Sequence, residues 1–246
     1  MTSSSDIDAI LARYPKARPP LPPAYAAVHE REYKLNREGG SLLTKMSSGL
    51  ESWMHRRVAA GPAGDVLEIG AGTLNQLRHE PVNAGYDVIE PFEALYRGSP
   101  ELQRVRSVYA DIAQVPAERR YRRVTSVAVL EHLDDLPAIV ARSGQLLDAE
   151  GVFQAGIPSE GGLAWTLAWK TTTGIAYWLR NRLDYSVLMH HEHLNTAAEI
   201  EAVVGHFFGD VRVARYLLPT RHLSFYTYLE ARAPRLEQIA AFLGRR

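Results

Sequence analysis

The sequence predicts an α/β fold in which helices cover both faces of a mostly parallel sheet. Short apolar runs typical of strands alternate with helical patterns between residues 65 and 157, and such alternation is typical of parallel sheets. Two more strand-like runs, 211–217 and 223–230, flank the segment Pro219-Thr220-Arg221-His222. This arrangement predicts an antiparallel hairpin that closes one edge of the sheet.

The predicted elements follow one another in a regular order. Before the sheet, residues 1–24 are polar and then rich in proline, which predicts an extended arm, and residues 25–60 look helical in two pieces. Strands are expected at 65–69, 86–89, 105–109, 123–129 and 151–157. Helices are expected at 75–79, 92–97 and 136–148, and another begins near Thr196.

Composition indicates one enzyme-sized soluble domain. The 246 residues are 46% hydrophobic, which is enough for one large core. Lys plus Arg and Asp plus Glu both number 28, so no basic surplus argues for a nucleic-acid partner. The absence of cysteine excludes disulfides and thiolate chemistry, and the first eight residues show no secretory signal. We therefore expect a cytoplasmic protein.

An aromatic segment, residues 163–179, stands apart from the rest of the chain. It carries three tryptophans and a tyrosine among Leu, Ile and Ala, and is interrupted by Lys170 and Thr171-Thr172-Thr173-Gly174. The apolar run is too short and too broken for a membrane-spanning helix. A helix on a membrane surface, with Arg180 and Arg182 at one end, is one interpretation. The weak polar face favours a helix that covers the functional site or forms a dimer contact.

The most informative motif is Asp65-Val66-Leu67-Glu68-Ile69-Gly70-Ala71-Gly72-Thr73. It reads as a buried strand followed by a tight turn, because Gly70 and Gly72 allow the backbone to approach a ligand closely. A helix from about Asn75 would direct backbone N–H groups at that ligand. Glu68 at the strand end can hold an ammonium group and ribose hydroxyls. The motif therefore favours a nucleoside that bears an amino acid over a pyrophosphate.

The run Leu67–Gly72 resembles the first motif of the class I S-adenosylmethionine-dependent methyltransferases, with Leu74 in place of the third glycine. The resemblance extends from about residue 43 to residue 231. It implies a Rossmann-like, seven-stranded methyltransferase fold and S-adenosylmethionine as the cofactor. It also implies the following parts: an N-terminal arm and lid helices at 1–60, a cofactor-binding core at 61–157, an acceptor-binding insertion at 158–200, and the rest of the core with the hairpin at 201–246.

Further predicted cofactor residues follow the later strands. Glu90 ends the second strand, where a carboxylate can accept both ribose hydroxyls, unless it is only a solvated acid at a strand end. The resemblance places Asp111 on the adenine amino group and Ile112 on the ring, although Asp111 can equally cap the next turn. The predicted cofactor-binding set is Glu68, Gly70, Ala71, Gly72, Glu90, Asp111, Ile112 and Leu130.

Two groups of histidines are candidates for catalysis. The resemblance places Glu131 and His132, after the fourth strand, near the sulfonium. The segment His190-His191-Glu192-His193 lies in the insertion, and His191 or His193 with Glu192 can form a base and its orienting group. The same cluster can instead be structural, with His193 and Asn195 capping the next helix, or bind a divalent metal with Glu131 or His132. Because Ala128 stands where metal-binding relatives carry a glutamate, no metal is predicted, and the catalytic candidates are His132, His191 and His193.

These features predict O-methylation of a saccharide or another small hydroxylated molecule by in-line displacement, with a histidine removing the proton. The saccharide preference rests on resemblance to bacterial glycan and natural-product enzymes. A cofactor-binding partner subunit without catalysis is an alternative. An NAD-dependent oxidoreductase is disfavoured, because its Gly-x-Gly-x-x-Gly fingerprint would need glycine at Asn75. A homodimer is compatible with the aromatic segment and the proline-rich arm.

Overall fold

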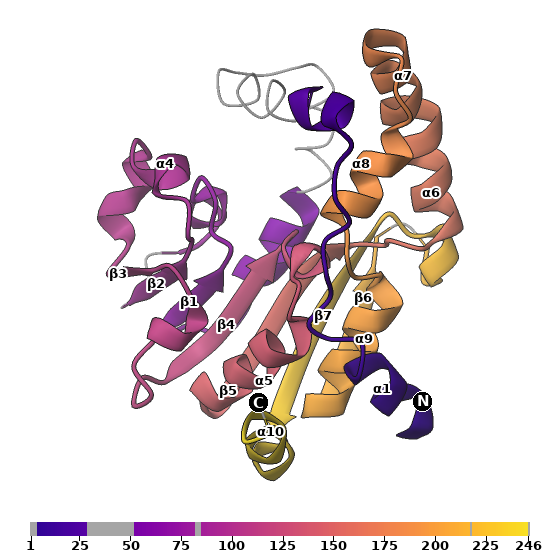
Figure 1. Ribbon diagram of the computed structural model, residues 1–246. Coiled ribbons are helices and arrows are strands. Elements are labelled where there is room, and N and C mark those ends of the chain that lie inside the picture. Colours follow the sequence, from indigo (N-terminus) through magenta and orange to yellow (C-terminus); the bar gives the residue numbers. More distant parts are fainter. Residues whose placement is uncertain (1–3, 29–51, 82–84, 217, 246) are drawn as a thin grey trace.

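A seven-stranded sheet with the order β3-β2-β1-β4-β5-β7-β6 forms the centre of the molecule (Figure 1). The computed structural model describes residues 4–28, 52–81, 85–216 and 218–245. The strands are β1 Val66–Ile69, β2 Tyr86–Ile89, β3 Ser107–Tyr109, β4 Tyr121–Val127, β5 Leu147–Pro158, β6 Phe208–Arg215 and β7 Tyr226–Pro234. The first five strands pair in parallel, whereas β7 runs antiparallel to β5 and to β6. The predicted parallel sheet and terminal hairpin are confirmed.

The register of the sheet brings the ends of its central strands together. Ile69 at the end of β1 lies beside Ile89 at the end of β2, and Ile89 lies beside Tyr109 at the end of β3. On the other side, Ile69 pairs with Ser126 of β4. Because these strands are parallel, the turns that follow them meet at one edge, which is where open α/β sheets bind ligands.

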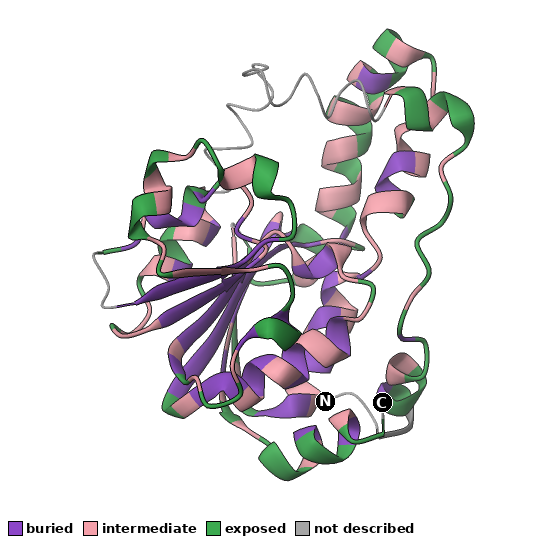
Figure 2. Ribbon diagram, turned by 60° about the vertical axis from the view of Figure 1, so that its left-hand side comes forward, coloured by how far each residue is buried: buried purple, intermediate pink, exposed green. Residues whose placement is uncertain are grey.

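Helices cover both faces of the sheet, as predicted. The helices α5 Leu136–Leu146, α9 Ala197–Phe207 and α10 Leu236–Leu243 pack in the main hydrophobic core against one face. The opposite face carries the helical residues 52–59 and α4 Glu93–Tyr96, together with two 3₁₀ turns, η1 Asn75–Arg78 and η2 Pro100–Arg104. The central strands β1, β2, β4 and β5 are consequently buried along most of their length between two layers, whereas the edge strand β6 is largely exposed (Figure 2). Two short 3₁₀ turns, η3 Ile112–Gln114 and η4 Leu130–His132, follow β3 and β4.

The helix predicted near Thr196 begins with a capping box. Thr196 Oγ1 accepts the backbone N–H of Glu199, and the Glu199 carboxylate accepts the backbone N–H of Thr196 at 2.9 Å. This exchange satisfies two amide groups that the first helical turn leaves without partners. It fixes the start of α9 directly after the histidine-rich segment.

The N-terminal segment differs from the extended arm predicted for residues 1–24. Residues Ser4–Leu11 form helix α1, because Ile7, Ile10 and Leu11 fall on one helical face. Ile7 is buried, and Ile10 and Leu11 pack against the main core beside α9. Only the proline-rich part that follows is extended, and it runs toward the top of the molecule in Figure 1. Residues 23–28 are helical again. Most of the region 25–60, which was predicted to be helical and to contribute the lid, lies outside the described residues.

The insertion after β5 rises beyond the carboxyl edge of the sheet (Figure 1). It consists of α6 Leu163–Trp169, the π-helical turn η5 Lys170–Gly174, α7 Ile175–Asn181 and α8 Tyr185–Glu192. The polar segment expected to interrupt the helix instead joins α6 to α7 as a wide turn, in which Thr171 and Thr172 donate their hydroxyls to backbone carbonyls of α6. Within the described parts of the chain, no helix is both long and apolar enough to cross a membrane.

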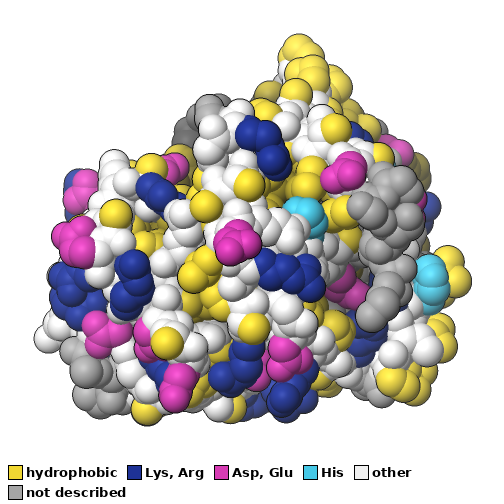
Figure 3. Space-filling model, turned by 90° about the horizontal axis from the view of Figure 1, so that it is seen from below, with side chains coloured by type: hydrophobic (Ala, Val, Ile, Leu, Met, Phe, Trp, Pro, Cys, Tyr) yellow, Lys and Arg dark blue, Asp and Glu magenta, His cyan; other side chains and the backbone are white. Residues whose placement is uncertain are grey.

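The opposite end of the molecule has mixed charge. In Figure 3, which views the molecule from below, basic and acidic side chains alternate across the surface. Arg106 pairs with Asp65 at 2.6 Å, and Arg122 pairs with Glu150 at 2.8 Å. A cavity of about 780 Å³ at the start of β5 is likewise bordered by both signs of charge. The predicted cofactor residues Gly70, Glu90, Asp111 and Ile112 lie instead at the carboxyl edge of the sheet.

Candidate active site

A cavity of about 620 Å³ opens at the carboxyl edge of β1 to β4. Four of the predicted cofactor residues line it: Gly70, Glu90, Asp111 and Ile112. These residues come from three successive strand ends, and the parallel register described above places them together. The sequence motif thus corresponds to a single concave site.

The glycine turn after β1 requires its glycines for two different reasons. Gly70 has φ +69°, and a Cβ at this position would lie 2.5 Å from a methyl group of Val129. Gly72 has φ +51° but nothing within 4 Å of a Cβ, so only its backbone conformation favours glycine. Leu74, in place of the third glycine, also has a left-handed backbone at φ +66° and is fully buried. Burial of its side chain offsets the conformational cost of this departure from the motif.

Glu90 connects the turns that follow β1 and β2. One of its carboxylate oxygens accepts the backbone N–H of Gly72 and the other accepts the backbone N–H of Phe92, both at 2.9 Å. The side chain is only 6% exposed, yet it lines the cavity. Each carboxylate oxygen can accept more than one hydrogen bond, so Glu90 retains capacity toward a ligand in the cavity.

Asp111 has the capping role that the sequence left open, in addition to its place in the cavity. Its Oδ1 accepts the backbone N–H of Ala113 at 2.7 Å at the start of η3. Ile112 follows as a buried apolar residue of the same cavity wall. Capping holds Asp111 in one rotamer, which pre-organises its second oxygen.

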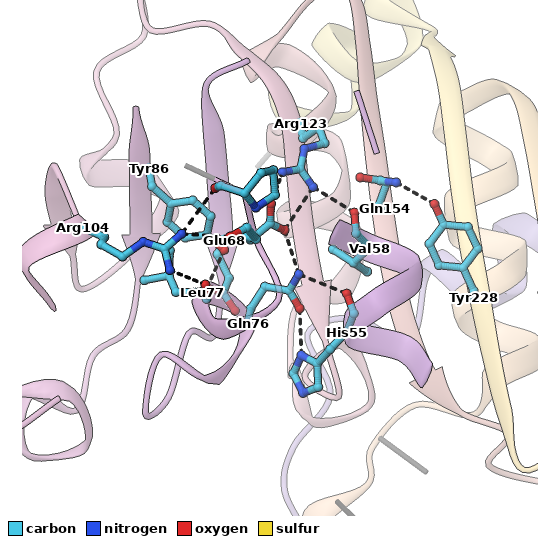
Figure 4. A network of polar contacts seen from close by, with 12 residues as sticks. His55, Val58, Glu68, Gln76, Leu77, Tyr86, Arg104, Arg123, Gln154 and Tyr228 are labelled. Atoms are coloured by element: carbon cyan, nitrogen blue, oxygen red, sulfur yellow. Dashed lines mark hydrogen bonds and ion pairs between the residues drawn. The ribbon is translucent and has the colours of Figure 1, made fainter. Parts of the chain in front are cut away.

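Glu68 is not brought together with the other predicted residues. Its carboxyl group is 4% exposed, accepts the Tyr86 hydroxyl at 2.9 Å, and does not line the cavity. Burial raises the pKa of Glu68 to about 8, because desolvation disfavours the charged carboxylate. The side chain belongs to a polar network behind the glycine turn (Figure 4).

That network contains a buried ion pair which the sequence analysis missed. Arg123, 1% exposed, binds both carboxylate oxygens of Glu80 and donates to the carbonyl of Val58 at 2.8 Å. Gln76 donates to Glu80 at 2.7 Å and lies 2.7 Å from Nδ1 of His55 (Figure 4). These contacts tie residues 52–59, η1 and β4 together. An arginine at the start of the strand predicted at 123–129 was the available signal, because such a charge needs a partner when buried.

Two predicted residues occupy places other than those expected. Ala71 is buried in the smaller core cluster behind the turn and donates its N–H to the carbonyl of Ile89 at 3.3 Å. Leu130 is fully buried in the main core and does not line the cavity; Val129 lines it instead. The left-handed backbone of Ala128, at φ +54°, turns the chain before this point. Val129 consequently borders the cavity, whereas Leu130 lies in the core.

A second cavity of about 260 Å³ lies between the segment 128–133 and the insertion. It contains His132 and His193, whose rings meet edge to face with centroids 4.8 Å apart. The remaining lining residues are Met54, Ala128, Glu131, Pro158, Trp165, Trp169, Tyr185, Met189 and Tyr226. Two of the three candidate histidines thus share one largely aromatic cavity.

Each of these histidines is oriented by a contact at Nδ1. His193 Nδ1 lies 3.1 Å from the Glu160 carboxylate, which also accepts the Trp165 indole N–H at 2.6 Å. His132 Nδ1 lies 2.8 Å from the carbonyl of Glu192, and its Nε2 lies 3.8 Å from the Glu131 carboxylate. A proton on Nδ1 satisfies both contacts and leaves Nε2 of each ring able to accept a proton.

The third candidate, His191, lies outside this cavity. Its Nδ1 is 2.6 Å from the carbonyl of Pro19 in the N-terminal arm. Helical geometry separates His191 from His193, because residues two apart do not face each other. Glu192, predicted to orient a histidine with its side chain, instead orients His132 through its backbone carbonyl. The carboxylate that orients His193 belongs to Glu160, which no local sequence pattern indicated.

The neighbouring Asn195 has a structural role. It donates to the carbonyls of Leu130 and Leu133 at 2.8 and 2.7 Å and accepts the Tyr14 hydroxyl at 2.7 Å. Asn195 therefore holds the histidine segment against η4, while Thr196 caps α9. Within the described residues, no group of three or more His, Asp or Glu side chains is arranged to hold a metal ion.

Comparisons with known proteins identify the fold. No protein-family model and no curated protein matches the sequence. Among solved structures, the plantazolicin methyltransferase BpumL in complex with SAH superposes with a TM-score of 0.57 at 9% identity, over 93% of this chain and 98% of that one. The DhpI-SAH complex gives 0.53 at 14% identity, over 94% and 96%.

A third match, the CurJ carbon methyltransferase, has a TM-score of 0.50 at 19% identity over 74% of this chain. This chain spans about half the length of that structure, 54%. Identities this low carry information on the fold and none on the acceptor. With its strand order, its antiparallel β7 and its glycine turn after β1, the chain has the fold of the class I S-adenosylmethionine-dependent methyltransferases.

Proposed function

We propose that this protein transfers a methyl group from S-adenosylmethionine to a hydroxyl group of a saccharide or another small-molecule acceptor. One observation carries the proposal: the cavity with Glu90 and Asp111 and the cavity with His132 and His193 both border the segment 128–133. A cofactor in the first cavity and an acceptor in the second would meet at this segment. Such an arrangement supplies the proximity that in-line displacement needs.

The first cavity supports the cofactor assignment. Glu90 would accept the two ribose hydroxyls, Asp111 the adenine amino group, and Ile112 would pack on the ring. The backbone from Gly70 to Gly72 would lie against the methionine portion. Glu68 would act from behind, through the polar network that supports the turn. When bound, S-adenosylmethionine supplies an electrophilic methyl carbon and a thioether leaving group.

The second cavity supports a histidine-assisted reaction. Nε2 of His193 would accept the hydroxyl proton as the acceptor oxygen forms its bond to the methyl carbon and the carbon–sulfur bond breaks. The Glu160 carboxylate at Nδ1 would stabilise the resulting imidazolium, as a carboxylate does behind other catalytic histidines. The ring of His132 would lie beside that of His193, and the contact between its Nδ1 and the carbonyl of Glu192 would fix the direction of its Nε2.

The walls of the second cavity favour a ring-shaped acceptor. Trp165, Trp169, Tyr185 and Tyr226 offer aromatic faces and edges that suit stacking on a sugar or a planar ring. The polar groups that remain are Glu131 and the two histidines, which can bind hydroxyl groups. These walls support both acceptor classes equally.

Two alternative functions can be distinguished by the ligand that each would bind. A cofactor-binding partner subunit would bind S-adenosylmethionine without turnover, although the paired His193 and Glu160 favour a working site. An oxidoreductase would bind NADH, although Asn75 lacks the glycine that its pyrophosphate turn needs. A cytoplasmic location and a homodimer stay predictions from the sequence.

The test is calorimetric titration of the purified protein with S-adenosylmethionine, its demethylated product and NADH, followed by methyl transfer to a panel of hydroxylated acceptors. We expect micromolar binding of the first two and none of NADH. Methyl transfer that requires His193 but not His191 would support the proposed base. Binding of NADH alone would overturn the proposal. Cofactor binding without transfer to any acceptor would favour the partner subunit.

A further inference from the structure

The outer face of the insertion carries a row of exposed apolar side chains. Leu163, Leu167, Ile175 and Leu179 have exposed fractions of 69, 64, 51 and 58%, and Trp178 has 50%. We refer to these five residues as the apolar stripe. A monomer seldom leaves a contiguous apolar surface of this kind exposed unless it binds something.

The π-helical turn keeps the stripe on one face. Residues four apart drift around an α-helix of 3.6 residues per turn, so a long row at this spacing would wind away from its starting face. The wider turn η5, between Leu167 and Ile175, offsets this drift because it accommodates more residues per turn. Ile175 and Leu179 therefore continue the line begun by Leu163 and Leu167.

The charged residues within the segment that carries the stripe are all positive, although Asp184 borders a cavity together with Ile175 and Trp178. Between residues 161 and 183 the chain carries Lys170, Arg180 and Arg182 and no Asp or Glu. The Arg182 guanidinium lies 4.6 Å from the centre of the Trp178 ring, and the Lys170 ammonium lies 5.7 Å from that of Trp169. The stripe thus combines aliphatic residues, tryptophan and cations, whereas the rest of the molecule has mixed charge.

We propose that the apolar stripe binds the surface of an anionic lipid membrane. Exposed Leu and Ile side chains would enter the boundary between headgroups and acyl chains, and Trp178 would lie at headgroup level. Lys170, Arg180 and Arg182 would face the anionic headgroups and be attracted to them. A second copy of this chain fits less well, because it would bring cations of like charge together.

The stripe is connected to the candidate active site. A cavity of about 350 Å³ is bordered by two stripe residues, Ile175 and Trp178, and also by Trp169 and Tyr185. The same Trp169 and Tyr185 line the cavity that holds His132 and His193. If the proposed methyl transfer holds, on which this step rests, the acceptor is an amphiphile. Its hydroxylated head would reach the histidines while its apolar part remains toward the membrane.

The test is sedimentation of the full chain with lipid vesicles. We expect binding to vesicles of equal parts phosphatidylcholine and phosphatidylglycerol, weaker binding as salt screens the cations, and little binding to phosphatidylcholine alone. The double variants Ile175→Ser/Leu179→Ser and Arg180→Gln/Arg182→Gln should each bind at least about tenfold more weakly.

Matched controls come from elsewhere on the surface. Leu236, 58% exposed on α10, and Arg212, with a side chain 73% exposed on β6, are as accessible as the residues of the stripe. Leu236→Ser and Arg212→Gln should leave vesicle binding unchanged. Each variant is first checked for folding by its thermal transition.

Failure of the chain to sediment with anionic vesicles would overturn the inference, as would stripe variants that bind as well as the unmodified protein. A mass by light scattering that falls from dimer to monomer in Ile175→Ser/Leu179→Ser, without vesicle binding, would assign the stripe to a second copy instead. Cofactor titration of the same proteins separates the two proposals. Vesicle binding without cofactor binding would sink the proposed function and leave the membrane surface standing.

Discussion

At the scale of single residues, Glu90 combines a structural and a proposed binding role. Its two oxygens accept backbone N–H groups from the turns after β1 and β2, so it shapes the cavity that it lines. A carboxylate fixed in this way loses little rotamer freedom when a ligand binds. Substitution of Glu90 is therefore the most direct single-residue test of the proposed cofactor site.

We predict that Glu90→Ala lowers the affinity for S-adenosylmethionine by about 10- to 100-fold, because hydrogen bonds to a charged group are worth about 1.5–3 kcal/mol. Calorimetric titration measures the loss. Glu93→Ala is the matched control, since Glu93 lies on nearby α4, pairs with Arg97 and does not line the cavity. Equal affinity of Glu90→Ala and the unmodified protein would contradict the ribose assignment.

The candidate base can be separated from the other histidines. His193→Asn should lower kcat by about 10²- to 10⁴-fold on a hydroxyl acceptor, the usual contribution of a general base. His191→Asn, whose ring contacts the arm and not the cavity, should retain turnover. Full turnover by His193→Asn would assign the base elsewhere.

Substitution of Gly70 and substitution of Gly72 should destabilise the protein for different reasons, and the two losses in stability can be compared. Gly72→Ala should lower the free energy of unfolding by about 1 kcal/mol, from backbone strain alone. Gly70→Ala should cost more, because its Cβ would also meet Val129. Adding Val129→Ala should recover part of the loss in Gly70→Ala and none in Gly72→Ala, as measured by chemical denaturation. Equal recovery in both backgrounds would show that the contact with Val129 is not the cause.

At the scale of elements, the proline-rich arm holds the histidine segment in place. The Arg18 guanidinium donates to the carbonyls of His191 at 2.7 Å, Glu192 at 3.3 Å and His132 at 2.8 Å. Lys16 donates to the carbonyl of Leu194 at 2.8 Å. Because the carbonyl of Glu192 orients His132, the arm supports the candidate site from outside.

We predict that Arg18→Ala loosens this segment. The backbone N–H groups of Leu194 and Asn195, which donate to the carbonyl of Glu131, should exchange with solvent faster in the variant. Arg13→Ala is the matched control, because Arg13 pairs with Glu199 alone among the described residues and is more than half exposed. Unchanged exchange in Arg18→Ala would show that the segment is held without the arm.

The elements also show which features local sequence patterns can predict and which they cannot. Val66, Leu67 and Ile69 predicted β1 to within one residue, since an apolar run between turn signals leaves few alternatives. Helix α1 was not predicted, because its apolar face is short and the helix is stabilised by packing against α9. The bond between His193 and Glu160 was missed for a similar reason, since the two residues are 33 positions apart and no period relates them. The glycine motif located the cavity proposed for the cofactor, whereas the cavity proposed for the acceptor arises from tertiary contacts.

At the scale of the whole molecule, the fold was predictable and the acceptor was not. Alternating strands and helices, one glycine turn and a terminal hairpin specify the class I architecture. The same architecture occurs in a carbon methyltransferase, CurJ, so it does not choose the acceptor atom. That choice depends on the insertion from Leu163 to Glu192, whose packing no repeating pattern describes.

Burial of Glu68 at the centre of the molecule couples stability to pH. Burial raises the pKa of Glu68 from 4.5 to about 8 in the folded protein, whereas an unfolded chain keeps the lower value. Between these pH values the unfolded state releases a proton that the folded state retains, so rising pH favours unfolding. The destabilisation is absent below about pH 4.5, grows as pH rises, and is complete near pH 8.

We therefore predict that Glu68→Gln, which keeps the shape of the side chain and removes its ionisation, raises the free energy of unfolding at pH 8 on the order of a few kcal/mol. At pH 4 the two proteins should be equally stable. Glu93→Gln provides a control of opposite sign, because pairing with Arg97 lowers the pKa of Glu93 and this contribution is lost on acidification. Chemical denaturation at several pH values measures both. A Glu68→Gln protein that tracks the unmodified one from pH 4 to pH 8 would show that the buried carboxyl group ionises as easily in the folded chain as in the unfolded one.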